Sequence, residues 1–114
     1  MAAYIVVHVD VKDWDAYREY ARHTPRVIQK FGGRFIARGG EMITLEGPEE
    51  TRRVVIIEFP SMDQAKAFYN SAEYTQTKKL REHGALANIV AVEGFPLEKW
   101  EESARESSQL SLPS

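Results

Sequence analysis

The sequence contains no cysteine and no apolar run long enough to cross a membrane. The first absence excludes disulfides, thiolate nucleophiles, iron–sulfur clusters and cysteine zinc sites. The second argues against a membrane-spanning helix, which needs roughly 20 consecutive apolar residues. The opening MAAYIVVHVD has no basic leader, and its apolar run is too short for a signal peptide. We therefore expect a cytoplasmic protein.

An excess of either charge is also missing. Lys and Arg together number 15 and Asp and Glu 17, which leaves a net charge of -2. The composition therefore provides no general attraction to nucleic acid or to an anionic membrane, and we predict neither as a partner. The chain has 114 residues, of which 43% are hydrophobic and 28% charged. This length and composition are typical of one compact domain.

Hydrophobic periodicity predicts four strands and two helical regions. Alternation in β-branched segments indicates strands over residues 4–11, 34–38, 53–59 and 87–93. Apolar residues at spacings of three and four predict a helix over residues 14–31, capped by Asp13 and interrupted in its hydrogen bonding by Pro25, which lacks a backbone donor. Ser61 and Gln64 form a capping-box pattern that starts the second helical region, which Asn70-Ser71 divides.

The order β-α-β-β-α-β is the split βαβ arrangement of ferredoxin-like α+β folds, in which two helices cover one face of an antiparallel sheet. Val6, Val54 and Ile56 make the other face partly apolar. An exposed apolar face implies a partner surface. We therefore predict a homodimer in which two copies pack sheet to sheet about a two-fold axis.

Glycines follow the second strand in RFIARGG, residues 34–40. A phosphate-binding loop would need the spacing GxxxxGK[ST] or GxGxxG with a helix after it, and RGGEMITLEG has neither. Gly39-Gly40 is better explained as a bulge or a positive-φ kink that bends the strand after Arg38. Residues 42–46, MITLE, are a candidate continuation of the strand beyond this break.

Several ordered segments resemble the small, mostly bacterial proteins of the DUF1330 family, a domain of unknown function. They cover roughly residues 3–95 and are GGRFIARGG, LEG at Leu45, RVVIIEFPS, Ala65, YNSAEY, Leu80-Arg81 and the closing VEG. The resemblance implies a dimeric α+β barrel in which two ferredoxin-like sheets enclose a cavity, and it implies no established reaction. His8 and the helix start DWDAY depart from the family pattern.

Glu58 is the one charge inside an otherwise apolar strand, and a carboxylate there requires an arginine partner. Arg34 and Arg38 share a face if the strand is regular, and the register decides which of them pairs with Glu58. One interpretation is a structural ion pair at the rim of the sheet. The other is that Arg38 and Glu58, joined by His8, line a cavity and bind a small polar or carboxylate-bearing ligand.

Further ligand-binding candidates lie near the divided second helix. Tyr69 and Tyr74 flank the Asn70-Ser71 break, where a phenol can donate a hydrogen bond or simply bury its ring. Arg81 belongs to the Leu80-Arg81 segment that resembles the family. The histidines lack HxH or HExxH spacing, so we predict no metal site, and we predict no cofactor. No catalytic residue can be assigned from spacing alone.

Composition changes after Phe95. We expect a domain over residues 1–95 and a tail over residues 96–114, with a helix from Leu97 to about Glu106, anchored by Trp100, and a Ser-rich end. The tail either docks Trp100 on the body or on a partner subunit, or it frays. The overall interpretation is a homodimer with a cavity between sheet and helices that binds or acts on a small molecule. The alternative is a non-catalytic dimeric binding or structural module.

Overall fold

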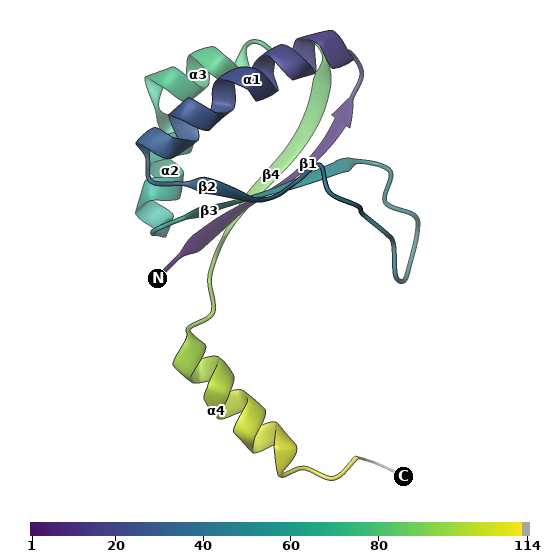
Figure 1. Ribbon diagram of the computed structural model, residues 1–114, viewed down its shortest axis with the longest axis vertical. Helices are drawn as coiled ribbons and strands as arrows, with labels where there is room; N and C mark the ends of the chain where they lie inside the picture. Colours follow the sequence, from purple (N-terminus) through teal and green to yellow (C-terminus); the bar gives the residue numbers. More distant parts are fainter. Residues whose placement is uncertain (113–114) are drawn as a thin grey trace.

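The fold is built around a four-stranded antiparallel sheet with strand order β2-β3-β1-β4. In the computed structural model, which describes residues 1–112, three helices cover one face of the sheet and a fourth stands apart (Figure 1). The elements in chain order are β1 (Ala3–Val11), α1 (Trp14–Lys30), β2 (Arg34–Arg38), β3 (Arg53–Phe59), α2 (Met62–Asn70), α3 (Ala72–Lys78), β4 (Ala85–Glu93) and α4 (Leu97–Ser108). This confirms the predicted ferredoxin-like α+β order.

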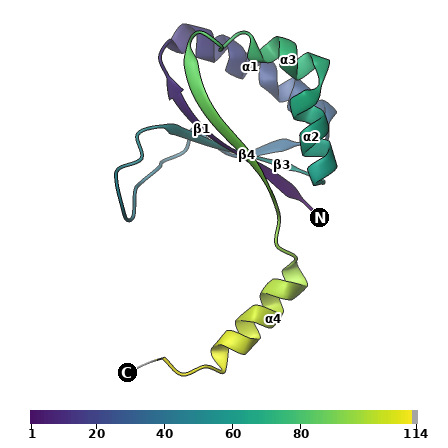
Figure 2. The same ribbon diagram turned by 180° about the vertical axis from the view of Figure 1, so that it is seen from behind.

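The core lies between the sheet and helices α1 to α3. Alternate residues of each strand point to the same face, so β1 and β3 each send one set of aliphatic side chains toward the helices. The main cluster is formed by Ala3, Ile5, Val27, Ile28, Val55, Ile57, Phe59, Ala65, Phe68 and Tyr74. The opposite face carries the other set of side chains and has no helix over it in residues 1–112 (Figures 1 and 2).

The predicted helix N-caps form, and the predicted capping box forms in part. Asp13 accepts hydrogen bonds from the backbone N–H groups of Asp15 and Ala16. Ser61 accepts one from Gln64 at 3.2 Å, but the Gln64 Oε1 atom is buried without a partner, so only half of the capping box forms. Ser71 ends α2 and caps α3 by accepting from the Tyr74 N–H, which places a break between the two helices where the sequence predicted it.

Two predicted strand boundaries are wrong. Residues 42–46 form no strand, because Gly39 adopts φ +73° and turns the chain away from the sheet edge into a projecting loop (Figure 1). The last strand begins at Ala85, two residues before the predicted start, because the register with β1 continues to Val11 opposite Ala85.

The C-terminal helix α4 lies on the opposite side of the sheet from α1 to α3 (Figures 1 and 2). None of its residues is buried, and Trp100 is 59% exposed, so Trp100 does not dock on the body of its own chain. The predicted tail extends to residue 114, but residues 113 and 114 lie outside the described part of the chain. Among residues 1–112, no helix has the length and apolar character that a membrane crossing requires.

Truncation after Gly94 should leave the melting temperature unchanged to within about 2 °C, because the removal of exposed side chains changes stability little. Thermal unfolding followed by circular dichroism of the full and truncated chains measures the difference. A fall of several degrees would contradict this expectation and would indicate that α4 packs against a second copy. Trp100→Ala in the full chain would then show how much of the fall comes from that one side chain.

Candidate functional site

The sheet register divides the candidate residues between two faces. Residues opposite each other on neighbouring strands point to the same side. β1 and β3 pair Tyr4 with Glu58 and His8 with Val54, which places Glu58 and His8 on the face without helices. The intervening residues, such as Val55, are buried toward the helices.

A bulge in β2 sends its two arginines to opposite faces. Phe35 lies opposite Ile57 and Ala37 opposite Ile56, so Ile36 is an extra residue without a partner. Arg34 therefore lies opposite Glu58, and its Nε is 3.3 Å from Glu58 Oε1. Arg38 lies opposite Val55 on the helix side. The expectation that the two arginines share a face is wrong because the bulge shifts the alternation by one residue.

Arg38 contacts α1 at a backbone carbonyl that Pro25 leaves without its usual hydrogen bond. In an α-helix the N–H of residue 25 would donate to the carbonyl of Ala21, and proline has no N–H. Arg38 Nη2 donates to this carbonyl at 2.8 Å, and Thr24 Oγ1 also donates to it at 3.2 Å. The Arg38 guanidinium lies 4.2 Å from the Phe35 ring centroid. The arginine thus bridges the sheet edge and α1, although it remains exposed to solvent.

Three polar side chains meet in the interior between α1 and α3. The hydroxyls of Tyr20 and Tyr74 are 2.8 Å apart, and Arg81 Nη2 lies 3.4 Å from the Tyr74 hydroxyl. The Arg81 guanidinium is also 5.1 Å from the Tyr20 ring centroid, within cation–π range. Burial, followed by the contact with Tyr74, raises the pKa of Tyr20, which keeps its phenol protonated at neutral pH.

This polar cluster and Arg38 line one cavity of about 30 Å³, enough for a water-sized molecule. Its polar wall contains only arginine, tyrosine and threonine side chains, all of which can donate hydrogen bonds. No aspartate, glutamate or histidine of residues 1–112 lines it. The remaining wall is aliphatic and aromatic. The cavity is therefore suited to a ligand that accepts hydrogen bonds and carries negative charge.

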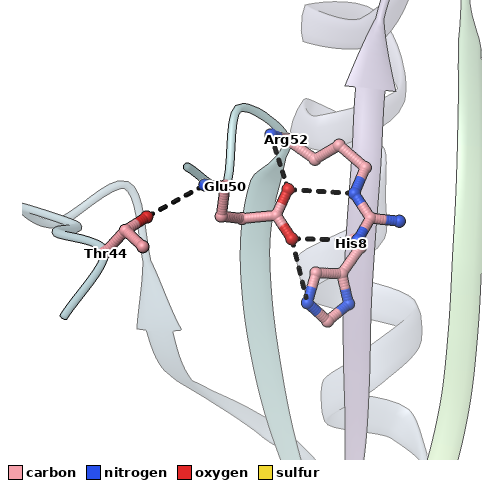
Figure 3. A network of polar contacts seen from close by, with 4 residues as sticks. All are labelled: His8, Thr44, Glu50 and Arg52. Atoms are coloured by element: carbon pink, nitrogen blue, oxygen red, sulfur yellow. Dashed lines mark hydrogen bonds and ion pairs between the residues drawn. The ribbon is translucent and has the colours of Figure 1, made fainter. Parts of the chain in front are cut away.

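His8 lies on the other face and holds the loop between β2 and β3 (Figure 3). Its Nε2 is 3.8 Å from Glu50 Oε1, while Arg52 donates to both Glu50 carboxylate oxygens at 2.9 and 3.0 Å. The Glu50 backbone N–H donates to Thr44 Oγ1 at 2.9 Å. The hydrogen bonds from Arg52 lower the pKa of Glu50 to about 2. The four residues tie the loop to β1.

The six sequence candidates thus separate into two groups. Tyr69, Tyr74, Arg81 and Arg38 line the cavity between sheet and helices. His8 and Glu58 lie on the opposite face and do not line this cavity, although His8 and Arg38 both line an open groove of about 690 Å³ beside the β2–β3 loop. Within residues 1–112 no group of three His, Cys, Asp or Glu side chains is placed to hold a metal ion.

Residues 2–95 match the family model described as "Domain of unknown function (DUF1330)". The chain belongs to the DUF1330 family. The match ends just before α4, so that helix lies outside the family domain. A comparison with curated proteins found no match.

Solved structures share the fold of this DUF1330 protein. A protein of unknown function from Rhodopseudomonas palustris is 18% identical, with a TM-score of 0.67 and 83% of each chain covered. A protein from Bacteroides fragilis, described as dimeric, of unknown function and with a ferredoxin-like fold, is 17% identical, with a TM-score of 0.53, over 82% of this chain and 96% of that one. At these identities the likeness shows the fold alone.

Sequence reasoning missed Tyr20 and Thr24 as polar members of the DUF1330 cavity. Tyr20 fits the apolar spacing that predicts the first helix, and its ring is packed against the core. A usable signal was present, because Tyr17, Tyr20 and Thr24 place three hydroxyls on one helical face at spacings of three and four. Such a repeat on a buried face requires hydrogen-bond partners inside the domain.

Proposed function

We propose that this DUF1330 protein binds a small carboxylate-bearing molecule in the cavity between the sheet and helices α1 to α3, and that it acts as a cytoplasmic homodimer. Arg81 carries the proposal. The residue is only 7% exposed, and its guanidinium contacts two tyrosines but no carboxylate among residues 1–112. A bound anion would supply the counter-charge that this buried cation lacks.

The energetics of Arg81 favour an anionic ligand. Removing a charge from water costs several kcal/mol, and a hydrogen bond to one phenol offsets only part of that cost. A carboxylate in the cavity would supply the missing charge and accept two parallel hydrogen bonds from the guanidinium fork. Because this interaction is made inside the domain, salt screens it much less than a surface pair.

The neighbouring tyrosines support the same ligand class. Their mutual hydrogen bond uses one of the two hydroxyl hydrogens, whichever residue donates. The other hydrogen is available to a ligand oxygen. Because the pKa of Tyr20 is raised by burial, this phenol serves as a donor and not as a base. We therefore assign the cavity to binding and orientation of an acceptor, with no reaction assigned.

The face without helices supports the homodimer. Val6, Val54 and Ile56 lie on it, and β4 adds Val90 and Val92, each about half exposed. Contiguous apolar surface of this kind is characteristic of an interaction site. A ferredoxin-like protein of the same fold, from Bacteroides fragilis, is described as dimeric. We propose that a second copy covers this face.

Arg81→Met should abolish stabilisation by carboxylates while leaving the unliganded melting temperature unchanged or raised, because an unpaired buried charge is replaced by an apolar side chain of similar length. For the unaltered chain, a carboxylate at 100 times its Kd should raise the free energy of unfolding by about 2.7 kcal/mol, which corresponds to a rise of roughly 10 °C in melting temperature. Thermal shift with acetate, butyrate, hexanoate and benzoate, each against its neutral amide, measures the effect.

Arg26→Met is the matched control, because Arg26 is exposed on α1 and its loss removes the same charge without touching the cavity. The control should keep the full carboxylate-induced shift. An equal shift in Arg81→Met and the unaltered chain would disprove the assignment of Arg81, and the absence of any carboxylate-specific shift in the unaltered chain would disprove the proposed function.

A further inference from the structure

A second, open groove lies beside the cavity, between α2 and β4. It has a volume of about 200 Å³ and is lined by Ile5, Ala65, Lys66, Tyr69, Asn70, Ile89 and Ala91. Three of these residues, Ile5, Tyr69 and Ile89, also line the inner cavity. The groove and the cavity are therefore neighbours, and they share the side chain of Tyr69 as a common wall.

Tyr69 is well placed to separate the two spaces reversibly. It lies in the last turn of α2, directly before the break at Asn70-Ser71, and is 37% exposed. The ring centroids of Tyr69 and Tyr74 are 5.4 Å apart, and Lys78 Nζ lies 5.1 Å from the Tyr69 ring centroid. Its hydroxyl makes no hydrogen bond within residues 1–112. Side-chain rotation would therefore break ring contacts only.

The two spaces differ in chemistry. The inner cavity presents the donors of Arg81, Tyr20 and Tyr74. The outer groove is lined by the apolar residues Ile5, Ala65, Ile89 and Ala91, together with Lys66, Tyr69 and Asn70. A molecule that satisfied both would have a carboxylate at one end and an apolar chain at the other. The inner volume of about 30 Å³ leaves no room for the tail of such a molecule.

We propose that the ligand is a monocarboxylate with a short apolar tail, whose carboxylate binds Arg81 and the tyrosine pair and whose tail lies in the outer groove past a rotated Tyr69. This rests on the carboxylate site proposed above. The groove contributes through apolar burial, so each methylene that enters it should lower the Kd about fourfold. Acetate, which has no tail to bury, depends on the inner site alone.

Ala91→Phe tests the tail site, because Ala91 lies on the helix side of β4 opposite Ile5 and a phenyl ring there would fill the groove. The Kd values of acetate, butyrate and hexanoate are measured by nuclear magnetic resonance titration. In the unaltered chain affinity should rise about fourfold per methylene. In Ala91→Phe the three acids should bind with equal affinity, close to that of acetate. Ala67→Phe, on the exposed side of α2, should behave as the unaltered chain.

Tyr69→Ala tests, through an association rate, whether the Tyr69 ring separates the cavity from the groove. Removing the ring should increase the association rate of hexanoate, measured by stopped flow, because no rotation has to precede binding. An unchanged rate would overturn the role of Tyr69. Acetate binding that needs Arg81 but shows no gain with chain length would overturn the tail site and leave the proposed function standing. Failure of all three acids to bind would overturn both.

Discussion

Gly33→Ala should destabilise the domain by about 3 kcal/mol and lower its melting temperature by roughly 10 °C, because the new methyl group has no room. A Cβ at residue 33 would lie 2.6 Å from Phe59 Cε1 and 2.9 Å from Ile28 Cγ2. Phe59 is fully buried, and Ile28 lies in the same core cluster, so neither side chain can move into solvent. The clash would have to be relieved by shifting α1 or β3.

Gly40→Ala is the matched control for this change. A Cβ there meets no atom within 4 Å, and Gly40 is not among the glycines with positive φ. The substitution should leave the free energy of unfolding within about 0.5 kcal/mol of that of the unaltered chain, or raise it slightly because the unfolded state loses entropy. Chemical denaturation of both variants measures the difference, and equal midpoints for Gly33→Ala and Gly40→Ala would contradict the packing argument. Ile28 also lines the cavity, so carboxylate binding should weaken with Gly33→Ala.

Ile56→Lys should convert the proposed dimer into monomers. Ile56 lies on the face without helices, opposite Val6 of β1 and Ala37 of β2. In a sheet-to-sheet dimer the two-fold axis would bury one new ammonium from each subunit without a partner. An uncompensated buried charge typically costs about 3–5 kcal/mol, so the two together should raise the dimer dissociation constant by at least roughly ten-thousandfold. Sedimentation velocity at micromolar concentration distinguishes a dimer from the 13.0 kDa monomer.

Gln76→Lys adds the same charge to the exposed surface of α3, away from the sheet, and should sediment as the unaltered chain does. Circular dichroism of both variants checks that the fold is retained. A monomeric unaltered chain would remove the basis for the dimer, and an Ile56→Lys variant that stayed dimeric would show that the interface lies elsewhere on the molecule.

The candidate site was only partly accessible to sequence reasoning. Tyr69 and Tyr74 were found beside the break between two helices, Arg81 through the family resemblance and Arg38 before the glycines, and all four line the cavity. Glu58 and His8 were grouped with Arg38 on the assumption of a regular strand. The structure places them on the opposite face, because one extra residue in β2 reverses the direction of every side chain after it.

The sequence by itself determined the order of the elements, because that order follows from local physics. Period-two alternation, the capping oxygens of Asp13 and Ser61, the Asn70-Ser71 break and the missing donor of Pro25 act within a few residues of one another. These signals predicted the ferredoxin-like arrangement and the division between α2 and α3.

Only the tertiary structure decided which side chains meet. The position of the β2 bulge depends on pairing with β3, and it turns Arg38 toward the Ala21 carbonyl that Pro25 leaves without its usual donor. Tyr20 and Tyr74 are 54 residues apart, and their hydroxyls come together only when α1 and α3 pack side by side on the sheet. Contacts between distant residues are chosen by packing and register, which no local pattern encodes, and the buried charge of Arg81 becomes visible only once that packing is complete.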